Sequence, residues 1–158
     1  MEPTAYHEAG HAYLAVIHGG RVRLLTLEPD RDDGPARFGE ARIEWQHPLT
    51  AKEQHHKWVL VALAGPVAEM IYNGEPLHPG FVAEWADDWQ QAWAAAEFIL
   101  PDERLRLAFL EEAVRQVHAL LRQDAAWACI AALADELLAH ETLEWDQMQD
   151  VFQQWLRR

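Results

Sequence analysis

Hydrophobic positions along the chain recur with a helical period in most segments and with a period of two in a short stretch near the N-terminus. Residues 4–18 are mostly good helix formers without an internal proline, and the Gly19-Gly20 pair that follows is a helix stop signal. This segment predicts a first helix. Partial alternation over residues 21–28 and 37–45 predicts two strands joined by an acidic loop.

A long second helix is predicted from Thr50, whose hydroxyl can cap the helix N-terminus, to about Tyr72. The Gly65-Pro66 pair should bend this helix, because proline removes one of its backbone hydrogen bonds. Residues 73–82 include two glycines and two prolines and predict a loop. We expect a third helix to begin near Ala83.

Helical spacing continues to the C-terminus. One hydrophobic stripe consists of Leu107, Leu110, Val114, Val117 and Leu121. A later segment continues the pattern with Trp127, Ile130, Ala134 and Leu137. Thr142, Glu144 and Asp146 predict the start of a last amphipathic helix. We therefore predict a mainly α (α+β) fold, a single domain over residues 1–158 in which a first helix and a small β element precede a helical bundle.

Composition and charge exclude several classes of function. The chain has 158 residues, half of them hydrophobic, which suffices for one domain with a sizeable core. Its 13 basic and 26 acidic residues give a formal charge of -13, which repels phosphates, so we expect no nucleic-acid partner. A lone cysteine, Cys129, cannot form an intramolecular disulfide. Without a signal peptide or a transmembrane segment in this pattern, we expect a cytoplasmic protein.

Candidate chemistry appears at His7-Glu8-Ala9-Gly10-His11, an H-E-x-x-H pattern inside the first predicted helix. Residues four apart project from one helix face, so both histidines can bind one Zn²⁺ at about 2.0 to 2.1 Å. Glu8 can then take a proton from a water that attacks a peptide carbonyl. The pattern is typical of zinc metallopeptidases.

A catalytic zinc site uses three protein ligands, and the pattern supplies only two. Acidic or histidine side chains downstream can provide the third. The candidates on chemistry alone are Glu69, His78, Glu84, Asp87 and Asp88. Spacing does not choose among them.

Several segments resemble the peptidase domain of FtsH-type ATP-dependent zinc metalloproteases. Residues 5–12 read A-Y-H-E-A-G-H-A, as that family's helix does, and residues 63–69 are similar to its L-x-G-G-R-A-A-E segment. Residues 88–92 resemble its D-[LI]-x-x-A motif, and residues 133–143 resemble its closing L-x-x-x-L-[LI]-x-x-E-T-L pattern. The resemblance implies that Asp88 is the third zinc ligand, with Asp87 as the alternative if the register shifts by one residue.

The sequence also departs from that family. Pro66 stands at the second glycine of the family motif, and Trp89 replaces its usual leucine or isoleucine. No G-x-x-x-x-G-K-[ST] nucleotide-binding loop occurs in this sequence, so we expect no ATPase activity of its own and consider a separate ATPase partner. Family domains form six-membered rings, but the high negative charge opposes close packing, and we expect a monomer or small homo-oligomer.

Together these observations predict a zinc-dependent endopeptidase, a hydrolase that cleaves flexible or unfolded polypeptides. His7, His11 and Asp88 would hold the metal, and Glu8 would be the general base. One alternative is a catalytically inactive interaction module that retains either the fold with the zinc or the fold alone. A second alternative is a helical adaptor in which the H-E-x-x-H pattern is accidental.

Other conspicuous residues have simpler interpretations. Trp85, Trp89 and Trp93 form an aromatic stripe that we expect to pack in the core. The acidic run at residues 30–33 lacks the ligand pattern of a calcium loop and is expected to be a solvated turn. His18, His55 and His56 receive no role. Cys129 lies among alanines and is expected to be an inert core thiol.

Overall fold

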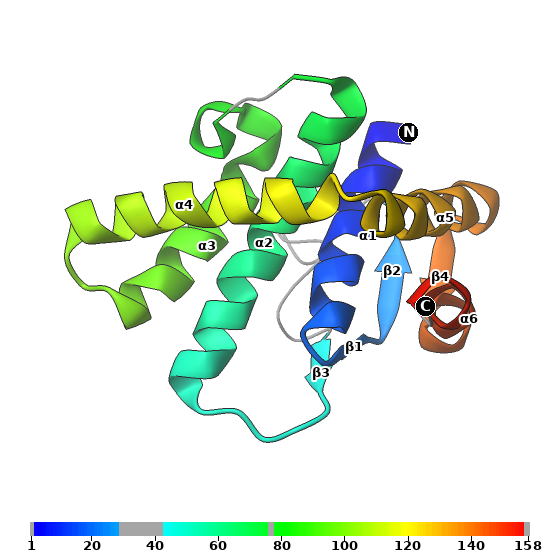
Figure 1. The fold of residues 1–158 in the computed structure, drawn as a ribbon, viewed down its shortest axis with the longest axis horizontal. Helices are drawn as coiled ribbons and strands as arrows, with labels where there is room; N and C mark the ends of the chain where they lie inside the picture. The colour runs from blue at the N-terminus through cyan, green and yellow to red at the C-terminus, as the bar shows by residue number, and fades with distance from the viewer. Residues whose placement is uncertain (1, 29–42, 76–77, 157–158) are drawn as a thin grey trace.

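The computed structural model describes residues 2–28, 43–75 and 78–156 (Figure 1). Helices α1 (Glu2–Ile17) and α2 (Ala51–Asn73) pack closely against each other at its centre. A Cβ atom at Gly10 would lie only 2.6 Å from the backbone oxygen of Ala64, so the absence of a side chain at residue 10 permits this close contact. The two helices agree with the predicted segments to within two residues at each end.

Within the described residues, four short strands form two separate antiparallel pairs. β1 (Gly20–Val22) pairs with β3 (Ile43–Trp45), and β2 (Leu24–Thr26) pairs with β4 (Thr142–Glu144). The predicted strand over 21–28 is thus divided between two partners. The first part of the other predicted strand, residues 37–42, and the acidic run at 30–33 lie outside the described residues.

The prediction that Thr142 starts the last helix is wrong. Thr142–Glu144 is strand β4, and helix α6 (Trp145–Leu156) begins directly after it. Leu143 is fully buried opposite Leu25, and the Thr142 hydroxyl lies 2.9 Å from that of Thr26. Pairing with a strand more than a hundred residues away therefore overrides the local helix start signal.

The start of α2 matches its sequence signature closely. The Thr50 side chain accepts a hydrogen bond from the Glu53 backbone, while the Glu53 carboxylate accepts one from the Thr50 backbone. This reciprocal capping satisfies two backbone donors that a helix end leaves open. The helix continues through Pro66 and ends at Gly74, which has a left-handed backbone conformation with φ of 76°.

The segment after α2 contains two short 3₁₀ helices, η2 (Pro79–Phe81) and η3 (Ala83–Trp85), which lead into α3 (Ala86–Ile99). Helix α4 (Glu103–Leu121) then crosses α2 and α3, and α5 (Asp124–His140) packs against α1 (Figure 1). The described residues thus have the predicted mainly α (α+β) fold. None of their helices combines the length and the apolar character needed to cross a bilayer.

One predicted stripe differs from the structure at its first position, whereas Leu110, Val117 and Leu121 are buried as predicted. Leu107 is exposed on α4, and the neighbouring Arg106 is buried instead. The Arg106 guanidinium donates hydrogen bonds to the carbonyl oxygens of Leu100 and Pro101 and lies 4.7 Å from the centre of the Trp93 ring. A charged residue can occupy this buried position because the carbonyl groups of the α3–α4 turn and an aromatic face replace water. The hydrophobic spacing alone could not show this.

Candidate metal centre

The H-E-x-x-H segment lies in the middle of α1, as predicted, on the face that contacts α2. His7, Glu8 and His11 are only 8%, 6% and 1% exposed, although polar residues of these types are rarely buried without partners. The two histidine rings lie 4.8 Å apart between their centres and are nearly perpendicular. The helix therefore presents both imidazoles to one small, largely dry region.

Asp88, in the first turn of α3, completes a cluster with these two histidines. Its Oδ2 atom lies 2.7 Å from Nε2 of His7, and its Oδ1 atom lies 3.3 Å from Nε2 of His11. One potential ligand atom from each residue lies within 4.8 Å of the others. Residues separated by about 80 positions in the chain thus converge with the two-nitrogen, one-oxygen donor set of a zinc site.

The second ring nitrogen of each histidine also has a partner. Nδ1 of His7 donates a hydrogen bond to Oε1 of Glu69 at 2.8 Å, and Nδ1 of His11 donates one to the carbonyl oxygen of Val61 at 2.7 Å. Both partners belong to α2. Such bonds fix the orientation of a metal-binding imidazole and direct its other nitrogen to the ion. Helix α2 therefore orients both histidines toward Asp88.

Gly65 provides the room in which the histidine rings lie. A Cβ atom at residue 65 would be 2.4 Å from Nε2 of His11 and 2.7 Å from Nε2 of His7, closer than atoms can approach. A glycine inside a helix usually costs about 1 kcal/mol relative to alanine, so it requires a packing reason. Here the reason is that the two nitrogen atoms that face Asp88 also face the backbone of residue 65.

The surroundings of the cluster favour the charged forms of both His7 and Asp88. Burial by itself would lower the pKa of His7, but hydrogen bonds to Asp88 and Glu69 outweigh it and raise this pKa to about 10. Burial would raise the pKa of Asp88, whereas the charges and hydrogen bonds of His11 and His7 hold it well below its usual range. Without metal, His7 therefore carries a proton on Nε2, which a metal ion at that atom has to displace.

The other third-ligand candidates have different positions. Glu69 contacts His7 at the nitrogen that faces away from Asp88, so it supports a ligand instead of completing the set. His78 lies 3.5 Å from Glu111 and packs against Trp89. Glu84 and Asp87 are exposed. The structure thus brings His7, His11 and Asp88 together, as the sequence resemblance implied, and not Asp87.

Sequence reasoning missed the parts of the site that come from α2. The Val61 carbonyl has no sequence signature, because any residue carries one. The glycine at position 65 was visible as an interruption in an alanine-rich helix, a pattern that indicates close approach of another group. Glu69 was recognised as a candidate, but its role depends on which nitrogen of His7 it faces.

The remaining candidate residues belong to the packing of the protein. Trp85 is buried, and Trp89 and Trp93 are half-buried against the core, as expected. Cys129 is fully buried, and burial raises the pKa of its thiol to about 12, as expected for an inert group. His55 stacks on Phe98 at 4.1 Å between ring centres.

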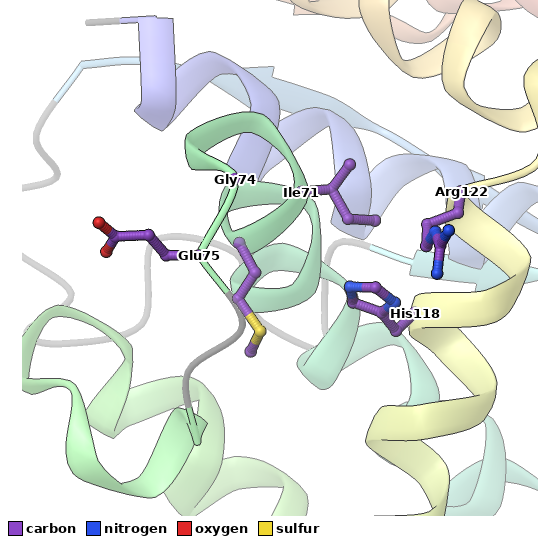
Figure 2. Close-up of a pocket in the computed structure, with 6 residues that line it drawn as sticks. Ile71, Gly74, Glu75, His118 and Arg122 are labelled. Atoms are coloured by element: carbon purple, nitrogen blue, oxygen red, sulfur yellow. The ribbon is translucent and has the colours of Figure 1, made fainter.

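Two cavities lie apart from the cluster. One of about 260 Å³ lies where the end of α2 meets α4, and Figure 2 shows His118 and Arg122 on its α4 side while the Glu75 carboxylate points away from them. Burial and the charge of Arg122 lower the pKa of His118, so this imidazole is neutral at pH 7. The other cavity, of about 360 Å³, lies beside β1 and β3 and is lined by Arg21, Glu44, Trp45 and Gln46. Neither is lined by His7, His11 or Asp88.

Comparison with known proteins gives no assignment. Neither a protein-family model nor a curated protein matches the chain.

Proposed function

We propose that this protein is a zinc metallopeptidase related to the FtsH-type peptidase domain. The convergence of His7, His11 and Asp88 in a buried cluster carries the proposal, because it joins the H-E-x-x-H helix to a carboxylate 77 residues downstream of His11. A bound Zn²⁺ would supply Lewis-acid chemistry, which lowers the pKa of water and polarises a peptide carbonyl. The donor set suits this ion, and Gly65 leaves room for the two imidazoles that would hold it.

Within this proposal Glu8 is the general base. It lies between the two histidines in sequence and is buried with them, and its charge contributes to the raised pKa of His7. Glu69 and Val61 act as positioning groups that hold the imidazoles in one orientation while the proton moves.

The burial of the cluster also limits the substrate. His11 is 1% exposed, and the side chain of Asp88 is 14% exposed, so a peptide bond must be presented on an extended, thin segment to reach them. Folded domains rarely offer such a segment. The proposed substrates are therefore flexible or unfolded polypeptides, cleaved without ATP.

Elemental analysis and a cleavage assay test this function together. Wild type should hold one zinc per chain, and His11→Ala should lose it, whereas Asp87→Asn should keep it because Asp87 is exposed. Glu8→Gln keeps the size of the side chain but removes the base, so it should retain zinc and cleave denatured casein about 100-fold or more slowly.

Two results would contradict the proposal. Full zinc occupancy in His11→Ala would remove the site assignment. Equal inactivity of zinc-loaded wild type and Glu8→Gln on a broad set of unfolded peptides would favour the non-catalytic interaction module instead.

A further inference from the structure

A third cavity, of about 280 Å³, lies between α2 and α3. Its lining residues are His55, Trp58, Gln91, Ala94 and Ala95. Both helices also carry parts of the candidate metal centre. Typical pockets for drug-sized ligands have about 300 to 1,000 Å³, so this cavity is of a size for one large side chain and small for a whole ligand.

On α3 the cavity continues the face that bears Asp88. Gln91 and Ala95 follow Asp88 at spacings of three and seven residues, which places all three on one side of the helix. Gln91 is about 4.5 Å further along the helix axis, at 1.5 Å per residue. Trp93 lies on the opposite side of α3, where its ring contacts Arg106 of α4.

On α2 the cavity likewise continues the face of the metal centre. His55 and Trp58 lie ten and seven residues before Gly65, on the stripe that includes Gly65 itself. His56, the neighbour of His55, instead contacts Phe109 of α4. The cavity therefore opens along the same side of α2 and α3 as the cluster, away from α4.

Small side chains create the space, and aromatic rings close its far end. Ala94 and Ala95 leave room beside the Trp58 ring, and the stack of His55 on Phe98 lies beyond them. Three of the five lining residues, Trp58, Ala94 and Ala95, are apolar. A large apolar side chain buried here would gain hydrophobic free energy that a small one would not.

We infer that this cavity is a specificity subsite, which receives a phenylalanine or leucine side chain of a polypeptide held near the metal centre. The inference rests on the proposed peptidase function. The two cavities described above lack this relation, since neither is lined by residues of α3.

Filling the cavity tests the inference. Ala94 is exposed on α3, so Ala94→Leu can add bulk at the cavity without overpacking the core. Exposed Ala139 on α5 offers Ala139→Leu as a matched control. Cleavage sites in denatured casein would be mapped by mass spectrometry for each zinc-loaded protein. Wild type and the control should cut mainly beside phenylalanine and leucine, and Ala94→Leu should lose these cuts by about tenfold or more while keeping those beside small residues.

Binding to the Glu8→Gln protein separates this inference from the proposed function. Two fluorescein-labelled extended peptides that differ only by phenylalanine or alanine at one position are compared by anisotropy. The phenylalanine peptide should bind about tenfold or more tightly, and adding Ala94→Leu should abolish this advantage. Equal binding of both peptides, or an unchanged cleavage profile in Ala94→Leu, would overturn the subsite even if the protein is an active peptidase. A preference that Ala94→Leu removes would support the subsite even if no cleavage occurs.

Discussion

At the scale of single residues, the candidate centre depends on one atom that is absent. Gly65 has no Cβ, and the histidine nitrogens that face Asp88 lie only 2.4 and 2.7 Å from where that atom would be. Overpacking of a tight contact usually costs about 1 to 3 kcal/mol, and the strain falls here on the rings themselves. The backbone of α2 is thus as much a part of the site as the side chains of α1.

Gly65→Ala should therefore weaken zinc binding strongly, by about 100-fold or more, because the imidazoles must rotate away from Asp88. Zinc affinity measured by competition with a chromophoric chelator would check this. Ala51→Gly, at the exposed start of the same helix, is the control and should bind zinc like wild type. Wild-type affinity in Gly65→Ala would show that the rings do not need this space.

The sequence predicted the residues of the candidate cluster better than the groups that hydrogen-bond to them. His7 and His11 share a helix, so a local pattern brings them together, and the structure places Asp88 beside them as the family resemblance implied. The bonds to Val61 and Glu69 depend on how α2 packs against α1, which no local pattern encodes. The hydrogen-bond partners that α2 provides to the two histidines therefore could not be assigned from the sequence.

At the scale of elements, α2 organises the fold because α1, α3 and α4 all pack on it. The sequence predicted its capping and its length, since both are determined locally. It misplaced the start of α6 and the buried side of the first turns of α4. For α6 a partner far away in the chain decides, because Leu25 pairs with Leu143. For α4 the preceding turn decides, because its carbonyl groups bind Arg106.

The turn between α3 and α4 should be sensitive to Arg106. Arg106→Leu removes the donors for the carbonyl groups of Leu100 and Pro101, and leaving such groups unsatisfied costs about 1 to 3 kcal/mol each. We expect the free energy of unfolding in urea to fall by about 2 kcal/mol or more. Arg104→Leu, at an exposed position on the same helix, should change it by less than about 0.5 kcal/mol. Equal effects of the two changes would mean that the turn does not depend on this guanidinium.

At the scale of the whole molecule, the candidate centre connects α1 to α3, which have α2 between them. Ligands that bind only the folded state stabilise it by mass action, and an ion at 100 times its dissociation constant adds about 2.7 kcal/mol. The hydrophobic core includes residues of α5 and α6. None of the three candidate ligands, His7, His11 and Asp88, belongs to these helices. Metal should therefore add to stability without being required for folding.

Removal of zinc with a chelator should lower the thermal unfolding midpoint by several degrees while leaving the helical circular dichroism at 25 °C almost unchanged. Restoring zinc should restore the midpoint, and Asp88→Asn should show little response to the chelator. Loss of helical signal on chelation would instead show that the ion is needed to hold the fold.

The pairing of β2 with β4 also affects the order of events during protein synthesis. The H-E-x-x-H helix leaves the ribosome before residues 142–144, so the adjacent strand Leu24–Thr26 finds its partner only after those residues have emerged. Helix α5, which packs on α1, is also made late. A nascent chain thus carries the histidines before their surroundings are complete, and the proposed hydrolytic activity would mature only after residues 142–144 have been made.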